Sequence, residues 1–128
     1  MIKFRAWYMP FGKYGAMQEM VYSRASHILA LAETEPEKYI PEQFTGLKDV
    51  NGKDIYVGDI VHFGSIWCVG DEYDPREEEH IGAVEYCQDY AGYVVNCNGK
   101  IYPLEQVISF DGYSVQGNVH ENPELLEK

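Results

Sequence analysis

Residues 43–61, Gln-Phe-Thr-Gly-Leu-Lys-Asp-Val-Asn-Gly-Lys-Asp-Ile-Tyr-Val-Gly-Asp-Ile-Val, form the part of the chain in which turn residues and apolar residues follow each other most regularly. Asn51-Gly52 joins two residues that tolerate a positive φ, which predicts a two-residue type I′ hairpin turn. Gly58-Asp59 precedes the apolar pair Ile60-Val61 and predicts the start of the next strand. The stretch therefore predicts β-structure, and its turn residues are assigned structural rather than catalytic roles.

The same pattern recurs toward the C-terminus, where Asn98-Gly99 separates the apolar runs 93–97 and 101–104 and predicts another tight hairpin. Short strands that begin at glycines bend readily, and a strongly bent sheet can close on itself to remove its open edges. We therefore predict a mainly β fold. It is either a small SH3-like barrel or a strongly bent antiparallel meander, with an N-terminal hairpin and short helical segments.

The length of 128 residues predicts one compact domain overall. Within it, we expect residues 1–42 to form an N-terminal strand, a hairpin and a connector. Residues 43–128 are expected to form a barrel-like body that ends in a short helical turn. Asn122-Pro123 predicts this turn, because it combines a capping residue with a proline at the first helical position.

The N-terminal part begins with residues 2–9, in which Ile, Phe, Ala and Tyr alternate with Lys, Arg, Trp and Met. This period of two predicts a strand. Chain-breaking proline and glycine residues follow, and residues 17–22 predict a second strand that completes a hairpin.

Residues 26–35 fit two structures. Ser26 could cap a helix whose apolar residues recur at helical spacing, but the same residues also fit a strand, so both interpretations stay open. Pro36 and Pro41 end this element, and residues 37–43 are expected to be a connector.

The net charge of −11 is concentrated in residues 65–128, which carry 3 basic and 13 acidic side chains. Nucleic acids and anionic membrane surfaces attract cationic side chains, so this charge argues against generic nucleic-acid binding and against membrane binding. It favours a basic protein partner or the N-terminus of another copy, where Lys3, Arg5, Lys13 and Arg24 face only Glu19 before residue 25. The acidic segment 70–80 has few apolar residues and predicts an exposed, mobile loop.

Cys68, Cys87 and Cys97 lack the spacing of a disulfide framework or a zinc site, so no cofactor is predicted. Met1 is followed by charged and aromatic residues instead of the apolar core of a signal peptide. No run approaches 18 apolar residues, the length needed for a membrane helix. We therefore expect a cytoplasmic protein.

Asp49, Asp54 and Asp59 recur at intervals of five residues and raise the possibility of a metal site. Each lies beside a turn, where a carboxylate accepts hydrogen bonds from nearby backbone N–H groups, and we favour this structural role. The four histidines match no metalloprotease motif, and no serine or cysteine lies in a nucleophile elbow. The sequence therefore predicts no enzyme.

Aromatic side chains on small barrels can stack on bases or on partner residues. Most of those in the predicted strands are expected to fill the core. Trp67 and Tyr90 lie beside predicted loops and are the aromatic candidates for an interaction. Lys3, Arg5 and Trp7 on the first strand are the candidates for a basic binding surface.

Three motifs in order resemble the YopX family of phage and prophage proteins: Ile-Lys-Phe-Arg-Ala-Trp at 2–7, the stretch 43–61, and Gly-Asn-Val-His-Glu-Asn-Pro-Glu-Leu-Leu at 117–126. The resemblance covers nearly the whole chain. It implies a mainly β fold, a phage or prophage origin, a bacterial host cytoplasm and self-association. It implies no activity and no catalytic residues.

Together these observations predict a phage or prophage accessory protein that is a non-enzymatic, homo-oligomeric protein-interaction module. The alternative is a nucleic-acid-binding β-barrel that uses the basic N-terminal strand and exposed aromatic side chains.

Overall fold

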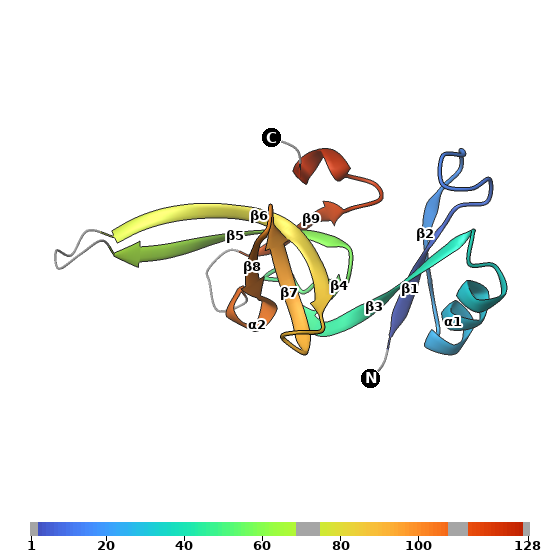
Figure 1. The fold of residues 1–128 in the computed structure, drawn as a ribbon, viewed down its shortest axis with the longest axis horizontal. Coiled ribbons are helices and arrows are strands. Elements are labelled where there is room, and N and C mark those ends of the chain that lie inside the picture. Colours follow the sequence, from blue (N-terminus) through green and yellow to red (C-terminus); the bar gives the residue numbers. More distant parts are fainter. Residues whose placement is uncertain (1–2, 69–74, 108–112, 127–128) are drawn as a thin grey trace. The chain divides into compact units, whose positions relative to one another are not determined.

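The computed structural model describes residues 3–68, 75–107 and 113–126, with only the backbone described for residues 65–68, 75–78 and 106 (Figure 1). Its contacts divide the chain into two compact units, Met1–Leu47 and Lys48–Lys128. The boundary predicted after Glu42 falls inside a strand. The mainly β fold predicted from the sequence is confirmed.

The first unit is a small sheet with one helix. Its elements are β1 (Phe4–Tyr8), β2 (Glu19–Ser23), α1 (Ala25–Thr34) and β3 (Tyr39–Lys48). β1 is the central strand of the unit, antiparallel to β2 on one side and to β3 on the other. The predicted N-terminal hairpin is therefore confirmed as β1 and β2.

Residues 25–34 form a helix and not a strand, which decides between the two interpretations of this segment. The N-cap is Arg24, which makes no side-chain capping bond, so the prediction that Ser26 caps the helix is wrong. The helix ends before Pro36, as expected for a residue that cannot continue it. Ile28 is its fully buried residue.

The expectation of a connector over residues 37–43 is wrong, because β3 begins at Tyr39. Pro41 lies within this strand, opposite Ala6. The backbone bonds from Phe44 N to Lys3 O and from Met9 N to Lys38 O show that odd-numbered β1 residues bond to β3. Ala6–Pro41 is therefore a non-hydrogen-bonded pair, and the missing N–H of proline costs the β1–β3 ladder nothing.

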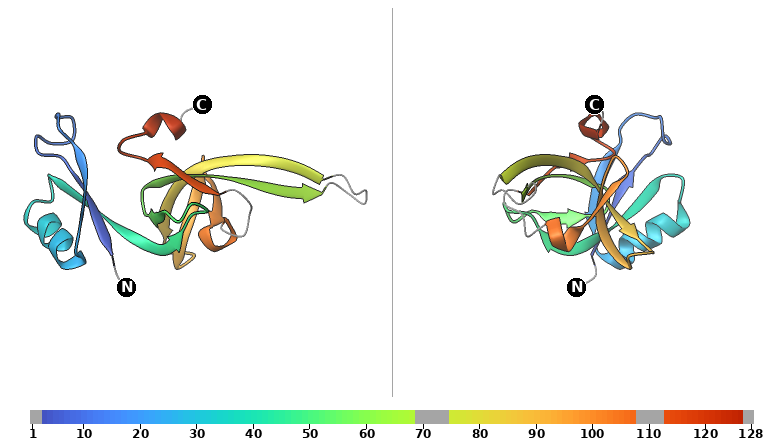
Figure 2. Two further views of the ribbon diagram at one scale, coloured as in Figure 1. Left: turned by 180° about the vertical axis from the view of Figure 1, so that it is seen from behind. Right: turned by 60° about the vertical axis from the view of Figure 1, so that its left-hand side comes forward.

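The second unit contains most of the strands. Its elements are β4 (Asp54–Tyr56), β5 (Asp59–Cys68), β6 (Pro75–Cys87), β7 (Gly92–Cys97), β8 (Lys100–Pro103), α2 (Leu104–Val107), β9 (Ser114–Asn118) and the 3₁₀ turn η1 (Pro123–Leu126). Five strands form one antiparallel sheet in the order β8-β7-β6-β5-β9. Figures 1 and 2 show the strong curvature of β6, and β7 pairs with its last five residues. The predicted C-terminal helical turn is confirmed as η1.

The interior of this unit is apolar, and both faces of several strands contribute to it. Phe63 is fully buried, with the Tyr102 ring edge-on at 5.3 Å between ring centroids. The buried apolar residues of the unit are Ile55, Tyr56, Ile60, Val61, Phe63, Ala83, Val84, Val94, Val95, Leu104 and Val107.

The expectation of a loop over residues 70–80 is wrong for its second part, and residues 70–74 lie outside the described residues. β6 begins at Pro75, which pairs with Cys68, and the ladder with β5 continues from there to Ala83. Backbone hydrogen bonds hold an antiparallel strand pair, and they do not require apolar side chains. The low apolar content of this segment was therefore a poor guide to its structure.

The two Asn-Gly pairs differ in the structure. Asn98 and Gly99 both have positive φ, 55° and 94°, and directly join β7 to β8. This confirms the two-residue turn predicted there. At Asn51-Gly52 only Gly52 has a positive φ, 81°, so the type I′ prediction is wrong.

The turn around Gly52 is a longer one. The Gly52 N–H donates to Asp49 O, and the Asp49 N–H donates to Lys53 O. A turn that is closed by a hydrogen bond between residues i and i+3, and that ends in a glycine with a positive φ, is typical of a three-residue hairpin loop with a β-bulge. The glycine is needed at the bulge, whereas Asn51 occupies an ordinary backbone conformation.

The Asp49 carboxylate organises this turn and ties it to β9. Oδ1 accepts from Asn51 N and Lys53 N, and Oδ2 accepts from Val115 N, each at 2.9 Å. Burial acts to raise the pKa of Asp49, but these three backbone N–H groups and the charge of Lys53 outweigh it, so the pKa lies below its usual value. The structural role predicted for this carboxylate is confirmed.

Gly52→Val is expected to destabilise the protein by about 1 kcal/mol or more, because a β-branched residue is strained at a positive φ. A Cβ at this position would meet no atom within 4 Å, so the cost comes from the backbone alone. Chemical denaturation measures it. Gly52→Asn, whose side chain tolerates this conformation, is the control and should cost less; equal stability of the Val variant and the wild type would contradict the turn.

Asp49→Asn is expected to destabilise the protein by about 1–3 kcal/mol at neutral pH, because the neutral amide accepts the three N–H groups less well. The folded-state pKa is depressed, so the stability that the carboxylate contributes is present above its unfolded pKa and is lost as the pH falls through the folded value. Denaturation from pH 7 to pH 3 should therefore show the two proteins converging below about pH 4. A difference that does not change with pH would contradict the role of the charge.

Candidate functional site

Ten residues, 9–18, join β1 to β2, and residues 10–18 of this connection form a loop that displays large apolar side chains. Phe11, Tyr14 and Met17 are 70%, 93% and 77% exposed. Figures 1 and 2 show the loop at the end of the β1–β2 hairpin opposite the N-terminus. Isolated exposed apolar residues are common on proteins, but three in one short loop suggest a contact surface. We call residues 10–18 the apolar loop.

The backbone of the apolar loop is folded into turns. The Gly12 N–H donates to Met9 O, and the Gly15 N–H donates to Gly12 O. Gly12 has a φ of 87°, which glycine adopts without strain. At Gly15 a Cβ would lie 2.5 Å from Cβ and O of Phe11, so the turn has no room for a side chain there.

The side-chain amide of Gln18 holds the loop together. Its Nε2 donates to the carbonyl oxygens of Lys13 and Gly15, each at 2.9 Å. Its Oε1 accepts from Nε1 of Trp7 at 2.9 Å. Trp7 is 5% exposed and lies on the central strand, so the amide fastens the loop to the buried part of the first unit.

A shallow hollow of about 380 Å³ lies at the base of the loop and is lined by Tyr8, Pro10, Phe11, Met17, Gln18 and Glu19. The Tyr8 ring stacks on Tyr39 of the neighbouring strand, with 4.8 Å between ring centroids. Burial, followed by the nearby Tyr8 and Glu35, raises the pKa of Tyr39 above its usual value. The base of the loop thus carries a stacked pair of tyrosine rings.

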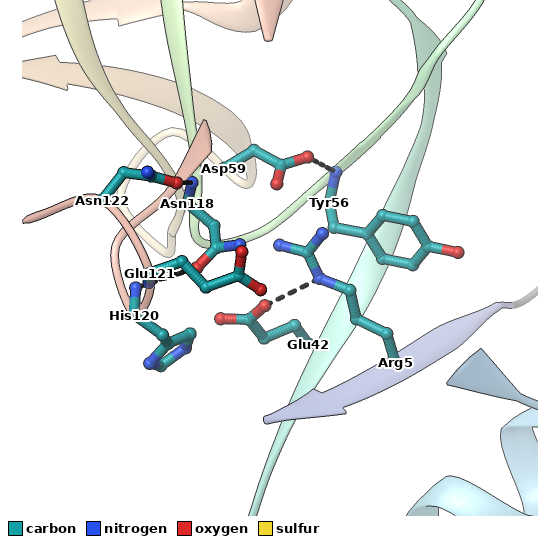
Figure 3. A network of polar contacts seen from close by, with 8 residues as sticks. All are labelled: Arg5, Glu42, Tyr56, Asp59, Asn118, His120, Glu121 and Asn122. Carbon is teal, nitrogen blue, oxygen red and sulfur yellow. Dashed lines mark hydrogen bonds and ion pairs between the residues drawn. The ribbon is translucent and has the colours of Figure 1, made fainter. Parts of the chain in front are cut away.

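The predicted basic strand does not present a basic face. Arg5 is 2% exposed, and its Nε lies 2.8 Å from Oε1 of Glu42, its direct partner on β3 (Figure 3). Trp7 is buried as described above, and Nζ of Lys3 lies 4.7 Å from the centroid of the Phe44 ring. The cationic groups of Arg5 and Lys3 therefore have partners within the first unit.

The other predicted interaction residues lie in the second unit. Tyr90 lies in the β6–β7 turn and is 46% exposed. The side chain of Trp67 lies outside the described residues. No interaction joins the predicted aromatic candidates into one site among the residues that the structure describes.

The remaining predicted turn residues have structural roles. Gly58 has a φ of 94°; its N–H donates to Val84 O and its carbonyl accepts from Val119 N. Asp59 is 1% exposed and accepts from Tyr56 N at 2.8 Å (Figure 3). Both residues hold the sharp bend from β4 into β5.

One pair in the first unit has the geometry of a nucleophile and its base. Ser23 Oγ lies 2.8 Å from His27 Nδ1, and both side chains are exposed. A general base is normally oriented by a further group and enclosed in a pocket. Neither accompanies this pair in the described ranges, and a hydrogen bond at the start of α1 is the simpler role. Among the described residues, no three His, Cys, Asp or Glu side chains group as metal ligands.

Sequence reasoning missed the apolar loop. Pro10, Gly12 and Gly15 correctly marked it as irregular, but the apolar residues between them were not weighed. The available signal was the presence of Phe11 and Tyr14 between Pro10 and Gly15, in a segment that has no strand or helix period to bury them.

The geometry defines a small mainly β protein with a helix-backed sheet, a bent five-stranded sheet and a structured apolar loop. The family model described as YopX protein matches residues 3–127. The chain therefore belongs to the YopX family.

Among solved structures, protein EF1440 from Enterococcus faecalis is similar, with a TM-score of 0.55 and 24% identity over 99% of each chain. At this identity the similarity shows the fold alone. No curated protein matches the chain. Within the described residues, no helix combines the length and the hydrophobicity needed to cross a bilayer.

Gln18→Ala is expected to destabilise the first unit by about 1–3 kcal/mol, because it removes the hydrogen bond of the Trp7 indole and two donors to loop carbonyls. Amide hydrogen exchange of residues 12–17 should become faster, as the loop loses the group that fixes it. Gln88→Ala, at an exposed position in the β6–β7 turn, is the matched control. Unchanged exchange in the loop of the Gln18 variant would show that other contacts order it.

Proposed function

We propose that this protein is a phage or prophage accessory protein that acts in the cytoplasm of a bacterial host cell. It acts by binding proteins, including further copies of itself, and catalyses no reaction. The apolar loop is the observation that carries this proposal. A loop that exposes two aromatic rings and a methionine, while its backbone is fixed, is suited to bind another protein.

The ordered backbone of the apolar loop lowers the entropy cost of binding a partner. Ordering a flexible loop on binding would cost conformational entropy for each residue fixed, and this cost reduces affinity. The turns at Gly12 and Gly15 and the Gln18 hydrogen bonds fix the loop before any partner arrives. Tyrosine, phenylalanine and methionine are also enriched at the centres of protein interfaces.

The uneven distribution of charge between the two units supports binding to a second kind of partner. Residues 1–47 carry five basic and five acidic side chains, whereas residues 48–128 carry five and sixteen. Opposite charges accelerate association and select partners. The second unit therefore suits a basic protein partner.

We also propose that the second unit is an SH3-like barrel. Its sheet order β8-β7-β6-β5-β9 places the last strand beside the first strand of the meander, and one helical turn, α2, precedes that last strand. Folds of this kind serve many unrelated functions, so this assignment adds nothing to the choice of partner.

The nucleic-acid alternative has less support. It requires cationic side chains to reach phosphates, and Arg5 is buried beside Glu42. A titration of a single-stranded oligonucleotide at low salt separates the two functions. Binding that weakens steeply with salt would favour the alternative.

We expect the wild type to self-associate at micromolar concentrations and the triple variant Phe11→Ser, Tyr14→Ser, Met17→Ser to lose this association, because the variant removes the apolar surface of the loop. Sedimentation velocity measures the mass. The matched control is Val50→Ser, Tyr90→Ser, Ile101→Ser, which removes exposed apolar side chains of the second unit and should leave the mass unchanged. A wild type that is monomeric at every concentration would contradict the proposed self-association.

A further inference from the structure

We propose that the hollow at the base of the apolar loop binds an arginine side chain that an extended segment of a partner protein presents. The proposal rests on the proposed function, protein binding by the apolar loop, and names the side chain that this loop receives. The hollow has a volume of about 380 Å³. This is near the lower end of the range for ligand sites, roughly 300–1,000 Å³, and suits one long side chain.

Three side chains form a row across the sheet of the first unit beside the hollow. Tyr8 on the central strand lies directly opposite Glu19 of β2 and directly opposite Tyr39 of β3. Directly opposite residues of antiparallel strands project from the same face of a sheet. Tyr39 stacks on one face of the Tyr8 ring, with 4.8 Å between ring centroids. The other face of the Tyr8 ring is therefore turned toward β2 and Glu19.

Glu19 gives the hollow its negative charge. Of the six described residues that line the hollow, it alone has a charged side chain, and this side chain is exposed. The nearby cations have other partners: Lys38 Nζ lies 3.5 Å from Oε1 of Glu35, and Lys13 Nζ lies 5.7 Å from the centroid of the Tyr14 ring. A carboxylate beside the face of an aromatic ring attracts a cation through both groups.

The shape of the guanidinium group favours arginine over lysine. A guanidinium is planar, so it stacks on an aromatic ring and can bond to a carboxylate through two N–H groups. The free face of Tyr8 and the carboxylate of Glu19 offer these two contacts side by side. The methylene stem of the arginine packs against the apolar walls that Phe11 and Met17 provide. A lysine ammonium would keep the charge but lose the stacking and the two-pronged bond.

The backbone of Met17 is an independent indication of a binding site. Met17 has a φ of 61°, a conformation that L side chains other than asparagine and aspartate seldom adopt. Its side chain is 77% exposed, so burial within the chain does not compensate for this strain. Strained backbone of this kind is concentrated at ligand sites. The flexible thioether of methionine also adapts its shape to a bound group.

A peptide titration tests the proposal. The probe is a capped five-residue peptide with arginine at its centre and glycine and alanine elsewhere. It is added to ¹⁵N-labelled wild type at a concentration at which sedimentation velocity shows a monomer. The amide signals of Tyr8, Phe11, Met17 and Glu19 should shift. The same peptide with citrulline, which keeps the shape but not the charge, should bind about tenfold more weakly, because it loses the ion pair and the cation–π contact.

Glu19→Gln removes the charge of the hollow and keeps the size of the side chain. It is expected to weaken binding of the arginine peptide about threefold to fivefold and to reduce the difference between the arginine and citrulline peptides. The matched control is Glu33→Gln, an exposed carboxylate on α1 that does not line the hollow; it should keep the wild-type values. Circular dichroism checks the fold of both variants, and the comparison of peptides on the wild type needs neither.

Each outcome decides a part of the proposal. Equal affinity for the arginine and citrulline peptides, or shifts away from the hollow, would overturn the site. Equal affinity for a lysine peptide would overturn the choice of arginine. Loss of self-association in Glu19→Gln would assign the hollow to a second copy and overturn the proposal. These failures leave protein binding by the apolar loop standing, because the mass of the triple variant tests that function separately.

Discussion

The hydrogen bonds of the Gln18 side-chain amide are the interactions on which the apolar loop depends. The amide joins the buried indole of Trp7 to the carbonyl oxygens of the apolar loop, at 2.9 Å in each case. A primary amide is suited to this position, because it has both an acceptor and two donors. Through it, the packing of the first unit fixes a segment that has no regular secondary structure of its own.

The two units contribute different physical properties. The first is electrically balanced and carries the apolar loop and the end strand β2. The second carries the whole net negative charge on a bent sheet whose turns are fixed by buried carboxylates such as Asp49 and Asp59. An apolar contact in one unit and an acidic surface in the other would allow one chain to hold a copy of itself and a basic partner.

Several elements were predictable because a local rule determined them. Asn98-Gly99 forms the turn that its sequence predicts, because these two residues alone join β7 to β8 and both adopt a positive φ. Asn51-Gly52 did not, because the Asp49 carboxylate draws two further N–H groups into a longer loop. Pro41 suggested a break, but its nitrogen falls at a position where the ladder needs no donor.

The surroundings of the predicted interaction residues were harder to predict than the strands. Arg5 and Trp7 alternate with apolar residues and seemed typical of an exposed face, yet the pairing with Glu42 and Gln18 buries them. These partners lie 37 and 11 residues away, and such long-range contacts leave no local pattern. For the same reason the order of the apolar loop could not be inferred from its composition.

The central claim is that the apolar loop is ordered in the free protein. Backbone ¹⁵N relaxation of the monomeric protein at low concentration tests it most directly. The account predicts order parameters for residues 12–17 close to the value of rigid backbone, about 0.85. Values below about 0.6, typical of a flexible segment, would contradict it.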